Sequence, residues 1–113
     1  MAASNPSIDQ LRQVLGDAET RGLIQLYLEH TAGEIRRLAI LPLDHQIMVV
    51  HALKGSSSQV GAKLFGAQCK AVEMSLRESG QLLTPNQIEN LASEFALASV
   101  PFQAWLAESA SPS

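Results

Sequence analysis

The sequence predicts an all-α fold, an antiparallel up-down-up-down four-helix bundle with a short additional helix at the N-terminus. Apolar residues recur at helical spacing in four long segments joined by short links, as antiparallel neighbours in a bundle require. Hydrophobic residues make up 46% of the chain and aromatic residues only 4%, which favours an aliphatic core between helices. The 113 residues are expected to form one domain, with residues 1–6 and 109–113 as flexible ends.

The first two helices are bounded by capping residues, a glycine and a proline. Ser7 begins a capping-box pattern and is the expected N-cap of a short helix over residues 8–15. Asp17 is the expected N-cap of a long helix over about residues 18–39. Pro42 must end that helix, because the residue before a proline is pushed out of the helical region. The apolar stripe of the long helix consists of Ile24, Leu28, Thr31, Ile35 and Leu38.

A central helix is predicted over about residues 45–60, with Asp44 as its N-cap. Its mostly apolar side lies opposite His51, so this histidine should face water. That side consists of Val49, Val50, Leu53, Ser57, Val60 and Leu64. Gly61 predicts a bend or a stop, and the pattern leaves open whether one helix continues into Lys63.

Two further helices complete the expected bundle. The first has an apolar stripe of Phe65, Cys69, Val72 and Leu76 and ends near Gly80. The second begins at Thr84, where a threonine N-cap, a proline at N1 and a glutamine at N3 form a strong start signal. Pro101 removes a backbone hydrogen bond from this last helix and is expected to kink or split it about three residues earlier.

Composition and charge argue against several classes of function. The net charge of −3 and the lack of a local Lys/Arg cluster predict no nucleic-acid surface. The single Cys69 excludes an internal disulfide and a cysteine zinc site, which indicates a reducing, cytoplasmic setting. No secretory signal is evident and no apolar run approaches the ~20 residues that span a bilayer, so direct membrane contact is not expected. His30 and His45 lack partners at metal-ligand spacing and should lie on the surface.

The candidate functional residue is His51, on the outer face of the central helix. Gly55 lies one turn further on and leaves space above the imidazole, and Lys54 lies on the flank at i+3. A glycine inside a helix costs about 1 kcal/mol, and the serines that follow Gly55 add no helix propensity. We interpret this low helix propensity as the cost of leaving space for a partner at His51. The alternative is an exposed helical histidine with no role.

These residues resemble the signature of histidine-containing phosphotransfer (HPt) domains of two-component phosphorelays. The resemblance rests on His51-x-Leu53-Lys54-Gly55-Ser56-Ser57, followed by Gly61-Ala62, Cys69 and Glu73, and on the helix layout of most of the chain. It departs at Val72, where a leucine is expected. It implies that His51 is phosphorylated on its distal ring nitrogen, that Lys54 neutralises phosphate charge and that Gly55 provides clearance. Cys69 would be structural.

The expected chemistry follows from imidazole, which at neutral pH is mostly neutral and nucleophilic. His51 would accept a phosphoryl group from a receiver-domain aspartate and pass it to another, while Lys54 neutralises charge. No general base for His51 is evident, and a carrier does not need one. The chain lacks ATP-binding motifs, so it is not expected to be an enzyme or to hold a cofactor. Catalytic groups and Mg²⁺ would come from the partner receiver domain.

Partner docking is assigned to four residues on the outer face near His51, namely Ile47, Met48, Ser58 and Ala62. Ile47 and Met48 have an alternative role, contact with neighbouring helices. The implied partners are response-regulator receiver domains and a hybrid sensor kinase, with the chain acting as a monomer. The sequence fits both a free-standing protein and the excised C-terminal part of a hybrid sensor kinase.

Two other interpretations remain open. One is a helical interaction module of the same fold that binds receiver or kinase domains without carrying phosphate. The retained His51 argues against this interpretation, because pseudo-phosphotransfer proteins, which carry no phosphate, lack the histidine. The other is a helical adaptor with an incidental histidine, which would have to explain Lys54 and Gly55 separately.

Overall fold

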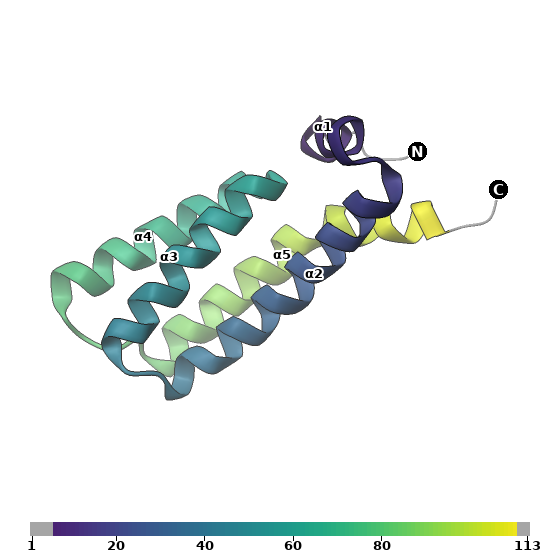
Figure 1. Cartoon of the computed structure of the whole chain (residues 1–113). Helices are drawn as coiled ribbons and strands as arrows, with labels where there is room; N and C mark the ends of the chain where they lie inside the picture. The colour runs from purple at the N-terminus through teal and green to yellow at the C-terminus, as the bar shows by residue number, and fades with distance from the viewer. Residues whose placement is uncertain (1–5, 111–113) are drawn as a thin grey trace.

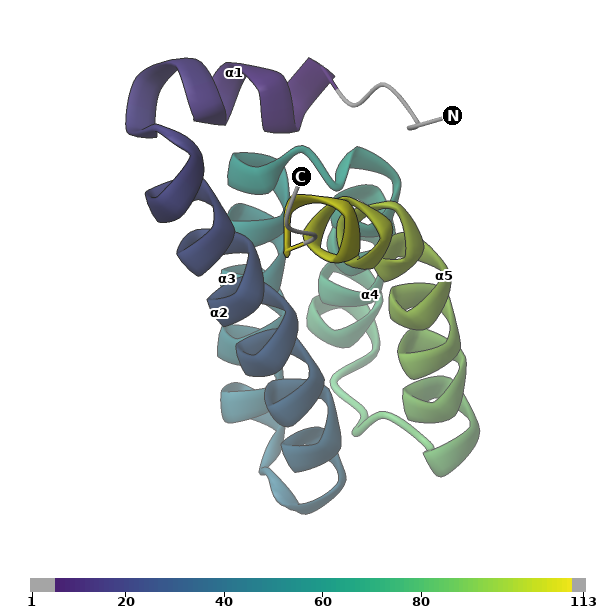
Figure 2. The same ribbon diagram turned by 90° about the vertical axis from the view of Figure 1, so that its right-hand side faces the viewer.

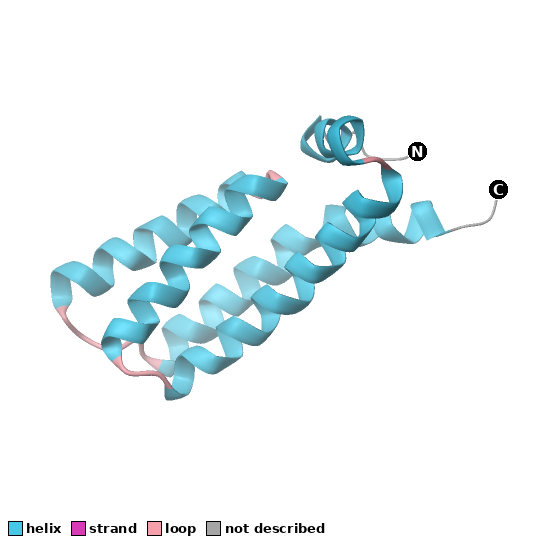
Figure 3. Ribbon diagram, viewed as in Figure 1, coloured by secondary structure: helices cyan, strands magenta, loops and turns pink. Residues whose placement is uncertain are grey.

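The computed structural model describes residues 6–110, in which every regular element is a helix (Figure 3). The elements in chain order are α1 (Pro6–Leu15), α2 (Asp17–Arg37), the 3₁₀ turn η1 (Leu38–Ile40), α3 (Leu43–Val60), α4 (Lys63–Ser79) and α5 (Pro85–Ala110). The predicted all-α class is confirmed. None of the helices in this part of the chain is long and apolar enough to cross a membrane.

The four long helices lie alongside one another and alternate in direction (Figure 1). Helix α2 contacts α3 and α5, and α4 contacts the same two helices. Helix α1 contacts α2 and α3 and lies across one end of the molecule (Figure 2). The most extensive contact joins α3 to α4. Gly66 of α4 contributes to it, because a Cβ atom there would already lie 3.6 Å from Cβ of Ser57.

The core is aliphatic along most of its length but aromatic where α2, α4 and α5 meet. All three phenylalanines and the single tyrosine of the chain are buried there, as Tyr27, Phe65, Phe95 and Phe102. The ring of Tyr27 meets those of Phe95 and Phe102 edge-on, with centroids 6.0 and 6.1 Å apart. Such pairs add about 0.5–1.5 kcal/mol beyond the area they bury. The few aromatic residues are therefore concentrated in the core, which the expectation of an aliphatic core did not anticipate.

Several predicted helix ends are confirmed by their geometry. Gly61 and Gly80 adopt left-handed conformations, with φ of 85° and 64°, directly after α3 and α4. At the start of α5, the Thr84 amide donates to the Gln87 side chain and the Gln87 amide donates to the Thr84 hydroxyl. Because α3 stops before Gly61, the expected buried position of Leu64 is wrong: this side chain is 77% exposed on α4.

The three predicted aspartate and serine N-caps are wrong, because each helix begins earlier than expected. Ser7, Asp17 and Asp44 lie within the first turns of α1, α2 and α3. The cap positions of α2 and α3 are Gly16 and Pro42, and neither makes a side-chain capping hydrogen bond. Carboxylates inside the first turn still interact favourably with the helix dipole, which explains their position.

The last helix is not split by Pro101, which lies inside the continuous α5. Its axis changes direction in the C-terminal segment that carries this proline (Figure 1). Pro6 and residues 109–110, expected in flexible ends, are helical. The other expected end residues, 1–5 and 111–113, lie outside the described part of the chain.

Candidate functional site

His51 lies on the outer face of α3, and 59% of its side chain is exposed. The opposite side of the helix is buried, with Val50, Leu53, Ser57 and Val60 in the interior, as predicted. Val49 is only half-buried. The Ser57 and Tyr27 hydroxyl oxygens lie 2.7 Å apart and share a buried hydrogen bond between α3 and α2. This burial fixes the rotation of α3 and therefore the outward direction of His51.

A carboxylate from α4 lies directly beside the exposed imidazole. The Nδ1 atom of His51 is 3.0 Å from Oε2 and 3.2 Å from Oε1 of Glu73. The Glu73 side chain is only 9% exposed, whereas the imidazole on the other side of the contact is open to water. No general base for His51 was evident from the sequence, and the structure places the Glu73 carboxylate beside Nδ1 of the ring. Glu73 was identified only through the family resemblance, without a role.

Two cationic side chains hold the same carboxylate. The Lys54 ammonium lies 3.1 Å from Oε1 of Glu73, and the Arg77 Nε and Nη2 atoms each lie 3.0 Å from Oε2. Burial by itself would raise the pKa of Glu73. The hydrogen bonds from Lys54, Arg77 and His51 outweigh burial and lower the pKa to about 2. Glu73 is therefore a carboxylate at neutral pH.

The charge on Glu73 determines which nitrogen of His51 carries the proton. An ionised carboxylate only accepts hydrogen bonds, so Nδ1 must donate its proton to Glu73. In the neutral ring, the lone pair is then on Nε2. Nε2 makes no hydrogen bond with any residue in the range 6–110. The arrangement therefore leaves a nucleophilic nitrogen free on an exposed ring.

Gly55 is open to solvent, as its predicted role requires. A Cβ atom built at Gly55 would meet no other atom within 4 Å. The fold therefore has room for a Cβ atom at this position, and no packing contact with another element explains the glycine. Because Gly55 has no side chain, the surface one helical turn beyond His51 carries no protruding group.

The four predicted docking residues do not all lie on the outer face. Met48 is 66% exposed and Ser58 is also exposed, as expected. Ile47 is half-buried and packs against the core, in agreement with its alternative role. The outward position expected for Ala62 is wrong: Ala62 is 7% exposed, because it follows Gly61 in the turn between α3 and α4.

The structure brings three further residues to this region that the sequence interpretation did not assign. Arg77 binds Glu73 from one turn further along α4, a spacing that could have revealed the pair. Lys63 and Lys70 lie seven residues apart on α4 and share one face of it. They join Lys54 around a groove beside the α3–α4 contact.

The two other histidines and the single cysteine lie where the sequence placed them. His30 and His45 are exposed, as predicted. Cys69 is fully buried, and burial raises the pKa of its thiol to about 12, which confirms its assignment to the core. In residues 6–110, no three His, Cys, Asp or Glu side chains are placed to hold a metal ion.

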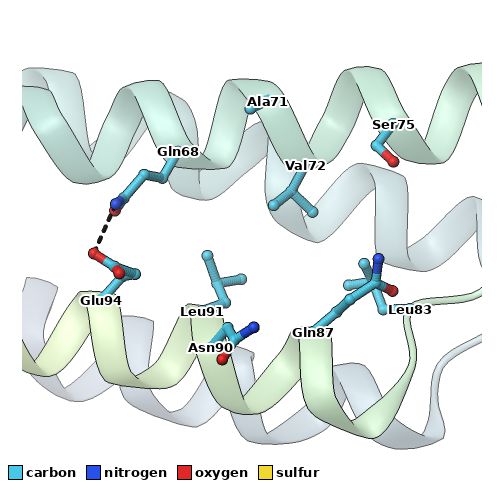
Figure 4. A pocket seen from close by; sticks show the side chains of 9 residues that line it. All are labelled: Gln68, Ala71, Val72, Ser75, Leu83, Gln87, Asn90, Leu91 and Glu94. Carbon is cyan, nitrogen blue, oxygen red and sulfur yellow. Dashed lines mark hydrogen bonds between the residues drawn. The ribbon is translucent and has the colours of Figure 1, made fainter.

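A hollow of about 310 Å³ lies between α4 and α5 (Figure 4). Val72 and Leu91 contribute apolar surface to it, and Gln68 donates a 2.7 Å hydrogen bond to Glu94 across one end. No histidine, cysteine or lysine lines it. It therefore offers no imidazole, thiol or ammonium group, and Ser75 supplies the one hydroxyl among its lining residues.

Comparison of the chain with protein-family models, curated proteins and solved structures finds no match in any of the three. The chemical capacity of the site follows from its own geometry. An exposed Nε2 can form a bond to an electrophile, and Glu73 can stabilise the positive ring that results. The Lys54 ammonium can balance negative charge that arrives with the electrophile.

Proposed function

We propose that the chain is a phosphorelay intermediate of the HPt type. His51 accepts a phosphoryl group from the aspartate of a receiver domain and passes it to the aspartate of another. The observation that carries the proposal is the contact between His51 and Glu73, which leaves Nε2 free on an exposed ring. The side-by-side packing of α2–α5 supports the antiparallel four-helix bundle that this function implies.

The transfer step needs no proton movement. The Nε2 lone pair of His51 attacks the phosphorus of the aspartyl phosphate, and an N–P bond forms as the P–O bond breaks. The aspartate leaves as a carboxylate with the bonding electron pair. The proton on Nδ1 stays in place, so the phosphorylated ring is positive and Glu73 balances its charge. Transfer to the next aspartate is the reverse of this step, which is why the site needs no general base.

Positioning and charge neutralisation are the main requirements of phosphoryl transfer. Lys54 supplies a positive charge beside the ring through its contact with Glu73. Gly55 leaves space for the active site of the partner. Mg²⁺ and the remaining catalytic groups belong to the partner receiver domain. The proposal includes a monomeric, cytoplasmic carrier that works with receiver domains and a hybrid sensor kinase.

The experiment is phosphotransfer from radiolabelled receiver domains encoded in the same genome. We expect acid-labile, base-stable label on the wild type and none on His51→Gln. His45→Gln is the matched control, because it removes another exposed histidine from the same helix and should leave labelling unchanged. If the wild type stays unlabelled with every receiver while circular dichroism shows a folded helical protein, the carrier function is wrong. The chain would then be a binding module that carries no phosphate.

A further inference from the structure

The three lysines of the chain all line one groove between α3 and α4. The groove has a volume of about 390 Å³, and no carboxylate contributes to its lining. Lys54 and Gly55 belong to both the groove and the surroundings of His51, so the two features adjoin. The sequence shows no local Lys/Arg cluster, because Lys54, Lys63 and Lys70 come together only when α3 and α4 pack.

The walls of the groove between the lysines are made of very small residues. Gly55 and Ser58 contribute from α3, and Gly66 and Ala67 contribute from α4. A chain segment of a partner can therefore approach both helices closely. Lys63 and Lys70 are two helical turns apart, which separates their Cα atoms by about 10 Å along α4. That span suits an extended acidic segment better than a single small anion.

The charges on α4 are available to a partner. Lys54 is already paired with Glu73, whereas Lys63 and Lys70 are exposed and form no hydrogen bond or ion pair within residues 6–110. Lys63 is also the first residue of α4, where a positive charge is unfavourable for the helix itself. The chain as a whole is negative, with a net charge of −3. A local positive groove on such a protein steers acidic surfaces towards itself.

We propose that this groove docks an acidic segment of the receiver domain that exchanges phosphate with His51, with Lys63 and Lys70 paired to its carboxylates. The inference rests on the proposed carrier function and adds which face the partner covers. The receiver then lies over the α4 side of His51 and reaches across Gly55.

The test is the rate of phosphotransfer from a labelled receiver domain to the double variant Lys63→Gln/Lys70→Gln. Arg36→Gln/Arg37→Gln is the matched control, since it removes two exposed positive charges from the last turn of α2. At low salt, we expect the double lysine variant to transfer about tenfold more slowly at limiting receiver concentration. The rate at saturating receiver should be unchanged, because neither lysine contacts His51 or Glu73. The difference should shrink to about twofold or less near 0.5 M salt, where charges are screened.

The outcomes separate this inference from the carrier function. If the wild type is labelled and the lysine variant keeps the wild-type rate and salt dependence, the docking inference is wrong and the carrier function stands. A lower saturating rate with unchanged salt dependence also contradicts docking, because it places the lysines in the transfer step. If the wild type is never labelled, both proposals fail. Circular dichroism checks that the variants are folded.

Discussion

The carboxylate of Glu73 on α4 lies 3.0 Å from Nδ1 of His51 on α3, so the orientation of the exposed ring depends on the packing of two helices. Lys54 and Arg77 hold that carboxylate in place from either side. The nucleophile is therefore supported by a charged cluster rather than by its own helix alone. Changes to the cluster should affect transfer without removing His51.

Glu73→Gln is expected to slow phosphotransfer by about 10- to 100-fold, the cost of removing the partner that orients a metal-bound histidine. The amide can still accept the Nδ1 proton, but it cannot balance the positive phosphorylated ring. Glu78→Gln is the control, since Glu78 is exposed on the same helix. Initial transfer rates measure the effect, and a wild-type rate for Glu73→Gln would show that the carboxylate has no part in transfer.

Glu73 should also make stability depend on pH. Its pKa is lowered from 4.5 to about 2 in the folded chain, so the stabilisation is complete above pH 4.5 and is lost as the pH falls towards 2. We expect a loss of about 1 kcal/mol, because solvent screens the partly exposed Lys54 and Arg77. Urea unfolding of the wild type and of Glu73→Gln at several pH values measures this loss of stability. A constant difference between the two proteins from pH 6 to pH 2 would contradict the charged cluster.

Gly55→Ala should have opposite effects on folding and on function. We expect the variant to be about 0.5–1 kcal/mol more stable, because alanine favours the helix and its Cβ meets no atom within 4 Å. Phosphotransfer should slow, because the methyl group occupies space that the partner needs. Thermal unfolding and transfer rates measure the two effects. Gly22→Ala is the matched control: it is equally open, lies on α2, and should gain stability without slowing transfer.

The buried hydrogen bond between Tyr27 and Ser57 should contribute to stability but not to transfer chemistry. Ser57→Ala leaves the Tyr27 hydroxyl without this partner, so we expect a loss of about 1–2 kcal/mol. A double-mutant cycle with Tyr27→Phe, measured by urea unfolding, isolates the pair. Additive losses in that cycle would mean that the two hydroxyls are not coupled.

The local features of the fold could be predicted because they depend on neighbouring residues. Gly61 and Gly80 end their helices through left-handed backbone, and Thr84 begins α5 through a reciprocal cap. The apolar side of α3 was sufficient to place His51 on the outside. Ala62 was misplaced because the helical periodicity was continued beyond Gly61, where the chain turns.

The contacts between helices could not be predicted from spacing along one helix. Glu73 is 22 residues from His51, and the two meet only because α3 and α4 pack closely through Ser57 and Gly66. The same packing gathers the three lysines around one groove. Sequence periodicity shows which side of a helix is buried, but not which residues of two helices face each other.

The most direct test of the account is to label the wild type with a phosphorylated receiver domain and identify the phosphorylated atom by NMR. The Glu73 contact predicts phosphate on Nε2 of His51 in the wild type and in His45→Gln, and none in His51→Gln. Phosphate on Nδ1 would contradict the role assigned to Glu73. A folded wild type that no receiver labels would contradict the carrier function itself.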